Sequence, residues 1–164
     1  MKRASFEDID CSVAQTLEQV GEWWTLLIIR DLFRFKNLHR FEEIQADLGI
    51  ARNILSDRLS RLVEVGIVEK RRYQERPERF EYHLTRKGVD LMPVILTLMA
   101  WGDTYGGWDD GPPVVLHHRD CDHDTHAIVA GAHCGEELDP RSLRGRVAEW
   151  ATTSAGAAPE TGDR

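Results

Sequence analysis

A change in the spacing of apolar residues near Gly66 limits the folds that this chain can adopt. Before it, residues 40–50 and 51–66 repeat apolar side chains every three or four positions, which is typical of two short amphipathic helices, and a glycine closes each stripe. After it, residues 67–73 and 79–84 are rich in β-branched and aromatic side chains, which predicts two strands. The two periods together predict a mainly α-helical α+β fold with one small β-hairpin.

Helical patterns also flank this unit. Ser12 opens a capping-box pattern ahead of apolar residues at helical spacing, which predicts a first helix at about 12–20. Residues 22–33 are apolar on nearly all sides, as expected for a helix buried in the middle of a small domain. Beyond the hairpin, Thr85 can cap a last helix, in which Pro93 should introduce a kink or delay the regular part.

Charge is unevenly distributed along the chain. The formal net charge is −7, yet residues 51–87 contain ten lysines and arginines against six acids. A helix pair followed by a basic hairpin is the order of a winged helix-turn-helix, in which the second helix enters the major groove of DNA and the hairpin lies along a phosphate backbone. The sequence therefore predicts a protein that binds double-stranded DNA.

Helical geometry selects the candidate DNA contacts. When the leucines between residues 55 and 62 face inward, the start of their helix turns polar side chains outward, and Arg and Asn are the side chains that read guanine and adenine edges. The predicted base contacts are Arg52, Asn53 and Ser56. The predicted phosphate contacts, which position the protein without reading sequence, are Arg58, Arg61, Arg71, Arg72, Arg76 and Arg79.

Other functions compete with this interpretation. A charged amphipathic helix and a hairpin can form a merely solvated surface. A winged helix can also serve as a protein-interaction module without binding DNA, which would suit the acidic net charge. An enzyme is not expected, because the chain contains no H-E-x-x-H, G-x-S-x-G or phosphate-loop motif.

Two long segments of the sequence resemble the HxlR-type family of bacterial transcriptional regulators. They read CSVAQTLEQVGEWWTLLIIRDLF and FEEIQADLGIARNILSDRLSRLVEVGIVEKRRYQERPERFEYHLTRKGVDLMPVILTLMAWG, and they extend over nearly all of residues 11–102. The resemblance implies a homodimer whose first and last helices pair across a two-fold axis, and which binds a palindromic operator as a repressor or an activator. Ala51 departs from the family pattern, because relatives often have serine or a similar capping residue there.

Cys11 is a candidate sensor of oxidants or electrophiles, because relatives often carry a responsive cysteine at this point. A helix dipole favours a thiolate at the helix N-terminus, and the thiolate is the reactive form. Against this, a free cysteine is often a small apolar filler, and the acids at residues 7, 8 and 10 oppose thiolate formation. The alternative effector is a small aromatic ligand held between the dimer helices and the core. The tryptophans considered for it are Trp23, Trp24, Trp101 and Trp108.

The segment 117–138 contains five histidines and two cysteines, which suggests a zinc ribbon. The candidate ligands are His118, Cys121, His123, His133 and Cys134. The second half of the ribbon is incomplete, because Gly131 stands where the first cysteine of a second C-x-x-C pair would be. Zinc here would be structural and is not required for DNA binding. A Cys121–Cys134 disulfide under oxidation and a metal-free hairpin of residues 114–118 and 126–131 are the other interpretations.

Composition predicts the organisation of the chain. A winged helix-turn-helix and dimerisation domain is expected at 1–107, a short ribbon-like appendage at 108–150, and a disordered, small and polar tail at 151–164. The longest apolar run, MPVILTLMAW, is far below the roughly 20 residues of a membrane span. The N-terminus lacks the apolar region of a secretory signal. We therefore expect a cytoplasmic protein that does not contact the membrane.

Overall fold

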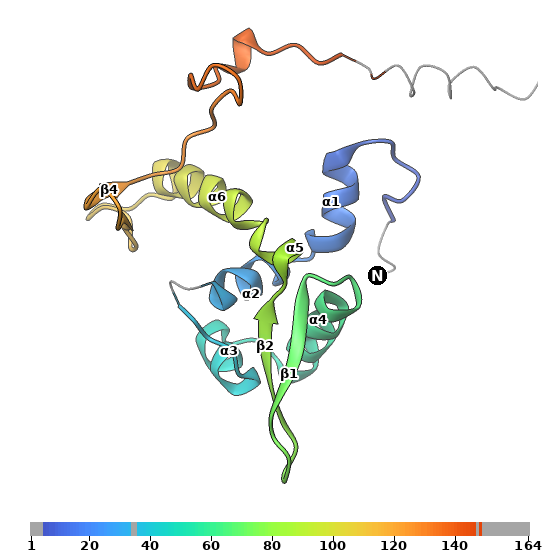
Figure 1. Cartoon of the computed structure of the whole chain (residues 1–164). Helices are drawn as coiled ribbons and strands as arrows, with labels where there is room; N and C mark the ends of the chain where they lie inside the picture. Colours follow the sequence, from blue (N-terminus) through green and yellow to red (C-terminus); the bar gives the residue numbers. More distant parts are fainter. Residues whose placement is uncertain (1–4, 34–35, 147, 149–164) are drawn as a thin grey trace, which may run out of the picture. The chain divides into compact units, whose positions relative to one another are not determined.

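The computed structural model of the chain describes residues 5–33, 36–146 and 148, which belong to two compact units, Met1–Ala127 and Ile128–Arg164 (Figure 1). The first unit contains α1 (Ser12–Val20), α2 (Thr25–Leu32), α3 (Phe41–Leu48), α4 (Arg52–Glu64), β1 (Val68–Gln74), β2 (Arg79–Leu84), α5 (Arg86–Val89), α6 (Met92–Tyr105), β3 (Leu116–His118) and β4 (His123–Thr125). The second contains the short 3-10 helix η1 (Pro140–Ser142). The tail predicted at 151–164 lies outside the described residues, and the boundary predicted after residue 107 stays a prediction.

The core of the first unit forms where α2 packs against the pair α3 and α4. Ile28 and Ile29 of α2 are fully buried, as are Ile44 of α3 and Leu55 of α4. Burying an aliphatic side chain of this size contributes about 1.5–3 kcal/mol to stability. The buried helix predicted within residues 22–33 is thereby confirmed.

Helix α2 also buries a carboxylate. Asp31 Oδ1 accepts hydrogen bonds from Arg30 Nε at 2.9 Å and from Arg30 Nη2 at 2.7 Å. Burial raises the pKa of Asp31, while the hydrogen bonds and charge of Arg30 act in the opposite direction. Lys36 Nζ lies 2.6 Å from Asp47 Oδ2 and 4.0 Å from Asp31 Oδ1. Because Asp47 belongs to α3, these ion pairs connect α2 to the helix-turn-helix.

The glycine turn between α3 and α4 is confirmed. Gly49 has φ of 61°, a left-handed conformation in which an ordinary side chain would be strained. Its amide donates to the carbonyl of Gln45 at 3.0 Å, and the side-chain amide of Gln45 donates to the carbonyl of Ile50 at 3.3 Å. Beyond the turn, Leu55 and Leu59 of α4 are buried with Leu62, as their spacing predicts.

The two predicted strands form an antiparallel hairpin. The register runs from Val68 opposite Leu84 to Arg72 opposite Phe80, and then shifts so that Gln74 lies opposite Arg79. Val68 is buried, so the base of the hairpin belongs to the core. The far end extends past α3 and α4 (Figure 1), which is the position of the wing in a winged helix-turn-helix.

The capping box predicted at Ser12 is wrong. Ser12 is the first residue of α1, and Cys11 occupies the N-cap position without a side-chain hydrogen bond. Gln15 instead folds its side-chain amide back onto the preceding loop, where it donates to the carbonyls of Phe6 at 3.3 Å and Ile9 at 3.2 Å. The helix was predictable from its apolar spacing, but its cap depended on the path of the residues before it.

Thr85 does not cap the long last helix. Its Oγ1 accepts a hydrogen bond from the amide of Gly88 at 3.2 Å and so caps the short helix α5. Helix α6 begins at Met92 with Pro93 in its first turn, where a missing amide hydrogen costs no helical bond. The predicted delay of the regular helix by Pro93 is therefore confirmed.

A second, smaller hairpin follows α6. Strand β3 pairs antiparallel with β4, with Leu116 opposite Thr125 and His118 opposite His123. The second strand is therefore β4 and not residues 126–131, which the metal-free interpretation predicted. Strand β4 comes earlier in the chain, so only a tight turn separates it from β3. Within the described ranges, no helix combines the length and the apolar character needed to cross a membrane.

Candidate nucleic-acid interface

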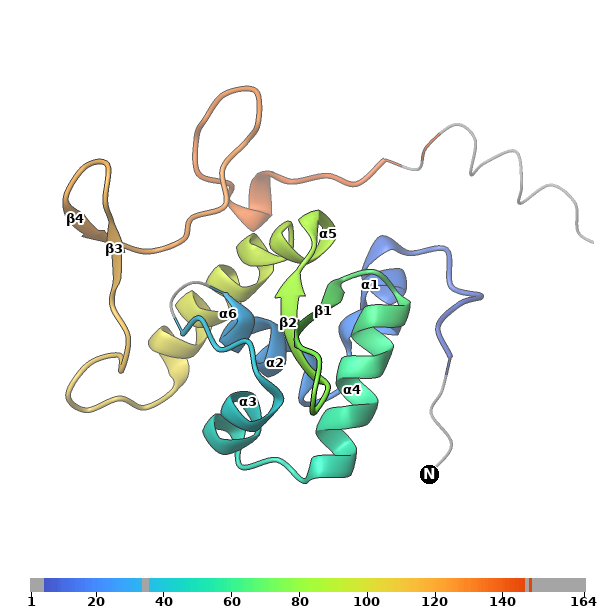
Figure 2. The ribbon, with the colours of Figure 1, turned by 60° about the horizontal axis from the view of Figure 1, so that its bottom comes forward.

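The start of α4 and the far end of the β1–β2 hairpin lie on the same side of the first unit (Figures 1 and 2). Arg52, Asn53 and Ser56 are exposed on α4, opposite the buried Leu55 and Leu59. Ala51 is the N-cap and offers no side-chain hydrogen bond to the first turn. The three residues predicted to read bases are thus presented together on a face that the core leaves open.

Arg52 is held by an aromatic ring. Its guanidinium carbon lies 4.7 Å from the centroid of Phe41, which belongs to α3. Stacking of this kind contributes about 0.5–1 kcal/mol at exposed sites and restricts the rotamers of the arginine. The donors at the edge of the guanidinium stay available, because no acid among the described residues forms an ion pair with it. Arg52 is therefore oriented without being neutralised.

The two arginines further along α4 already have acidic partners. Arg58 Nη2 lies 3.3 Å from Glu22 Oε2, its side chain is only 21% exposed, and Asp57 is a second partner at 3.5 Å. Arg61 Nη1 lies 2.9 Å from Glu64 Oε2. Contact with a phosphate would compete with these pairs, so Arg58 and Arg61 are weaker candidates than their helical positions indicate.

The arginines of the hairpin fall into two groups. Arg71 is paired with Glu69 on its own strand. Arg72 lies 3.5 Å from Glu78 and 3.8 Å from Glu75. In the part of the chain that the structure describes, Arg76 and Arg79 are exposed and have no ion-pair partner. These two are consequently the strongest candidates for contact with a phosphate backbone.

A cleft of about 630 Å³ lies between the hairpin and the starts of α3 and α4. Its lining includes Arg52 and Arg79, and also Arg40 and Tyr73, which the sequence did not single out. The guanidinium carbon of Arg40 lies 4.9 Å from the ring centroid of Tyr73, and its Nε lies 3.3 Å from Glu81. Arg40 lies just before α3, outside the segment from which the DNA contacts were predicted. Its proximity to the candidate interface becomes visible only when the hairpin is in place beside α3.

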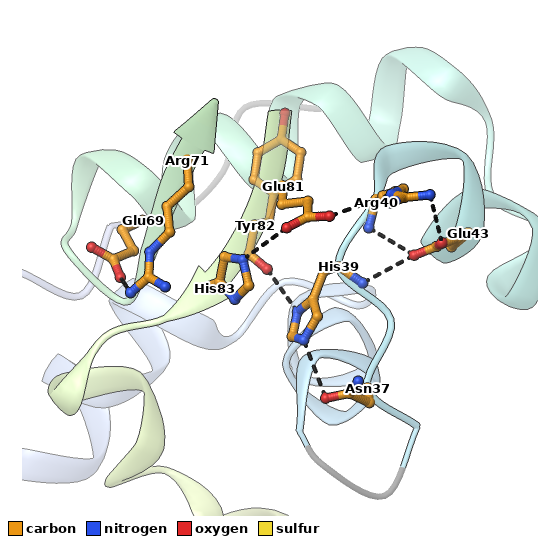
Figure 3. A network of polar contacts seen from close by, with 9 residues as sticks. All are labelled: Asn37, His39, Arg40, Glu43, Glu69, Arg71, Glu81, Tyr82 and His83. Carbon is orange, nitrogen blue, oxygen red and sulfur yellow. Dashed lines mark hydrogen bonds and ion pairs between the residues drawn. The ribbon is translucent and has the colours of Figure 1, made fainter. Parts of the chain in front are cut away.

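A polar network fixes the hairpin against the chain that enters α3 (Figure 3). His39 Nδ1 lies 3.0 Å from the carbonyl oxygen of Tyr82, and the amide of Tyr82 donates to the carbonyl of His39 at 2.8 Å. The rings of His39 and His83 stack with centroids 4.3 Å apart. Glu43 accepts hydrogen bonds from the amides of Arg40 at 2.9 Å and His39 at 3.2 Å, and the Arg40 amide in particular lowers the pKa of Glu43. These contacts attach strand β2 to the segment that enters α3.

The residues considered for sensing are placed separately. Cys11 is exposed at the N-cap of α1. Trp24 packs against the core, whereas Trp23 is 94% exposed, and Trp101 and Trp108 are also exposed. An aromatic ligand site among these tryptophans stays a prediction.

The candidate zinc ligands are divided between the two units. His118 Nδ1 lies 3.1 Å from Cys121 Sγ beside the β3–β4 turn, where the ring of His123 contacts the carbonyl of Cys121. His133 and Cys134 belong to the second unit. Within the described ranges, no three His, Cys, Asp or Glu side chains are grouped as a metal ion would require. Zinc binding is a prediction that this arrangement does not strengthen.

Comparison with known proteins places the chain among transcriptional regulators. The model of the HxlR-like helix-turn-helix family matches residues 19–110. An uncharacterised HTH-type transcriptional regulator of Mycobacterium tuberculosis (strain ATCC 25618 / H37Rv) is 45% identical over 132 residues, which cover 80% of this chain and 82% of that protein.

Solved structures give the same result. The crystal structure of PA1607, described as a candidate transcription factor, has a TM-score of 0.76 and 35% identity, and covers 87% of this chain and 99% of its own. The redox regulator HypR in its reduced form has a TM-score of 0.54 and 27% identity, and covers 59% of this chain and 95% of its own. These similarities agree with the winged helix-turn-helix described above.

Proposed function

This chain belongs to the HxlR-like helix-turn-helix family of transcriptional regulators, and we propose that it binds a palindromic DNA operator as a homodimer. The family and the relatives are regulators, so the chain is a regulator and not an enzyme. The proposal includes a cytoplasmic location, because a regulator must reach the chromosome, and it requires no cofactor.

The observation that carries the proposal is the shared orientation of two groups of exposed arginines and polar residues. Arg52 and Asn53 are exposed at the start of α4, Arg76 and Arg79 are exposed at the far end of the hairpin, and Arg52 and Arg79 line the same cleft. With α4 in the major groove, Arg52 and Asn53 would meet base edges while the hairpin follows the adjacent phosphates. Base reading and positioning are therefore assigned to different elements.

The proposed dimer uses the exposed apolar residues of α1 and α6. Val13 and Leu17 are exposed on α1, four residues apart and so on one face. On α6 a stripe at helical spacing is exposed, consisting of Val94, Leu98, Trp101 and Tyr105. A patch of this kind on a protein of this size indicates an interaction surface. Two copies related by a two-fold axis would present the same patch to each other.

A gel-shift titration tests the proposal. The full chain is titrated against DNA from the intergenic region upstream of its own gene, with random DNA as competitor. We expect a complex that resists competition, since specific binding typically exceeds non-specific binding by roughly 10³-fold or more. If random DNA at the same concentration as the upstream fragment displaces the protein from it, that fragment does not contain the operator. Equal binding across genomic fragments would contradict it altogether.

Arg76→Ala should weaken binding to operator and random DNA alike and reduce the dependence on salt. Each phosphate contact contributes about −0.9 to the slope of log affinity against log salt, so the slope should become shallower by about that amount. Filter binding between about 50 and 200 mM salt measures it. Arg86→Ala is the matched control, because Arg86 is exposed on α5 but paired with Asp90 at 3.0 Å. A winged helix that binds only proteins would show no such slope on DNA.

We also propose that oxidants or electrophiles act through Cys11. HypR is named as a redox regulator, and here Cys11 is exposed at the N-cap of α1, one of the two proposed dimer helices. The thiolate of Cys11 would add to a ring carbon of a quinone, the displaced C=C electron pair would move onto a carbonyl oxygen that takes a proton from water, and the ring would become a hydroquinone thioether. This places a bulky group where α1 begins. The two recognition helices would then be forced out of their spacing.

Treatment with a quinone should lower operator affinity at least tenfold in the wild-type protein and leave Cys11→Ser unchanged. Cys121→Ser and Cys134→Ser are the controls, because both thiols are also exposed. They should respond like the wild type. Equal loss of binding in Cys11→Ser would remove the sensing role from Cys11.

A further inference from the structure

Helix α6 has two different apolar faces. Ile95 is buried and anchors the first turn of the helix in the core. The exposed stripe that contains Leu98 and Trp101 forms the proposed dimer surface. At 100° per residue, Leu96, Ala100 and Asp103 lie on the opposite side of the helix. This second face has no role in the proposed dimer.

The chain that follows α6 lies beside this second face and leaves a cleft between them. The chain after α6 turns back beside the helix and carries β3 and β4 (Figure 2). The cleft has a volume of about 340 Å³ and is walled on one side by Leu96, Met99 and Ala100 and on the other by Val114 and Leu116. Its volume is at the lower end of the roughly 300–1,000 Å³ that is usual for small-molecule sites.

The charged groups of the cleft are negative. Among the described residues that line it, Asp103 is the one carboxylate, and there is no lysine or arginine. The remaining polar groups are the neutral hydroxyls of Thr104 and Thr125 and the imidazole of His126. The surrounding chain has the same sign, since residues 96–127 contain six aspartates and one arginine. A field of this sign attracts cations and repels carboxylates.

We propose that this cleft is a binding site for a small apolar molecule that carries a protonated amine. The hydrocarbon part lies against Met99, Ala100 and Val114, and the ammonium group faces the carboxylate of Asp103. A charge-assisted hydrogen bond to a carboxylate is stronger than one to a neutral hydroxyl, so Asp103 is preferred over Thr104 and Thr125 as the partner of the ammonium group. The inference stands on the cleft alone and does not depend on the proposed DNA binding.

Calorimetric titration of the full chain with a matched pair of probes tests the site. 4-Phenylbutylamine and 4-phenylbutyrate have the same apolar part and opposite charges. We expect the amine to bind at least tenfold more tightly than the acid. Equal affinity for the two probes, or no binding of the amine, would overturn the proposal.

Two substitutions locate the binding. Asp103→Asn should lower the affinity for the amine at least tenfold, whereas Asp110→Asn, an exposed acid outside the lining, should leave it unchanged. Ala100→Trp should fill the cleft and abolish binding, with a thermal melt to verify that the protein is folded. Unchanged amine binding in Asp103→Asn would show that the carboxylate is not the partner. If Ala100→Trp instead dissociates a dimer, the cleft is a protein interface and the proposal is wrong.

Discussion

Trp101→Asp should leave the chain monomeric and lower its affinity for a palindromic operator roughly 100-fold or more, because two linked half-sites gain about that much from effective concentration. Trp101 is 67% exposed on α6 and lies in the middle of the stripe that includes Leu98 and Tyr105. Its ring packs against the ring of Tyr105 with centroids 5.2 Å apart. An exposed aromatic side chain of this size on a regulator of this family points to a partner surface.

A two-fold interface doubles the effect of the substitution. Each subunit would contribute one aspartate to the proposed interface, so two carboxylates would lose water when the dimer forms. Burying a charge without a partner is strongly unfavourable. The folded monomer should be unaffected, because the position is already exposed to water.

Sedimentation and gel shift on the same preparations measure the two consequences. Val129→Asp is the matched control, because Val129 is an exposed apolar residue of the second unit and lies outside the α6 stripe. Trp101→Phe keeps an aromatic ring and should retain the dimer. If Trp101→Asp sediments as a dimer, α6 is not the interface. If it is monomeric but binds the operator as tightly as the wild type, the half-sites are read independently.

The order of the elements was predictable because it follows from periodicity, which is a local property. The apolar stripe of α4 and the glycine at position 49 determine a helix end and a turn wherever the segment is placed. Likewise the delayed start of α6 follows from the chemistry of Pro93 alone. Caps were less predictable: Ser12 has a suitable side chain, but the chain enters α1 one residue earlier, and Gln15 bonds the loop instead.

The partners of the arginines could not be read from the sequence. Arg58 pairs with Glu22, and both α2 and α3 lie between these two residues in the sequence. Arg40 contacts Tyr73 of β1 and Glu81 of β2 only because the β1–β2 hairpin lies beside the start of α3. Helical position correctly indicated that Arg52 faces outward, whereas Arg58 is half-buried against Glu22. Whether an arginine is free to contact phosphate depends on acids brought near by tertiary folding.

Arg52→Ala should lower affinity for the operator by about 1–3 kcal/mol, a loss of roughly fivefold to 150-fold, and relax base preference at one position of each half-site. The guanidinium is oriented by Phe41 and carries no acidic partner among the described residues, so its edge is available to a base. Arginine can donate two parallel hydrogen bonds to the acceptors of guanine in the major groove. Binding to random DNA should fall much less.

Two further variants separate base reading from charge. Arg52→Lys keeps the positive charge but loses the planar pair of donors, so it should resemble Arg52→Ala on the operator and the wild type on random DNA. Phe41→Leu removes the ring that orients Arg52 and should produce an intermediate loss, with a thermal melt to separate any loss of stability. Selection of binding sites from a random pool, performed with each variant, identifies the affected base. Equal loss of affinity on operator and random DNA in Arg52→Ala would assign Arg52 to a phosphate, and base reading would then rest on Asn53 and Ser56.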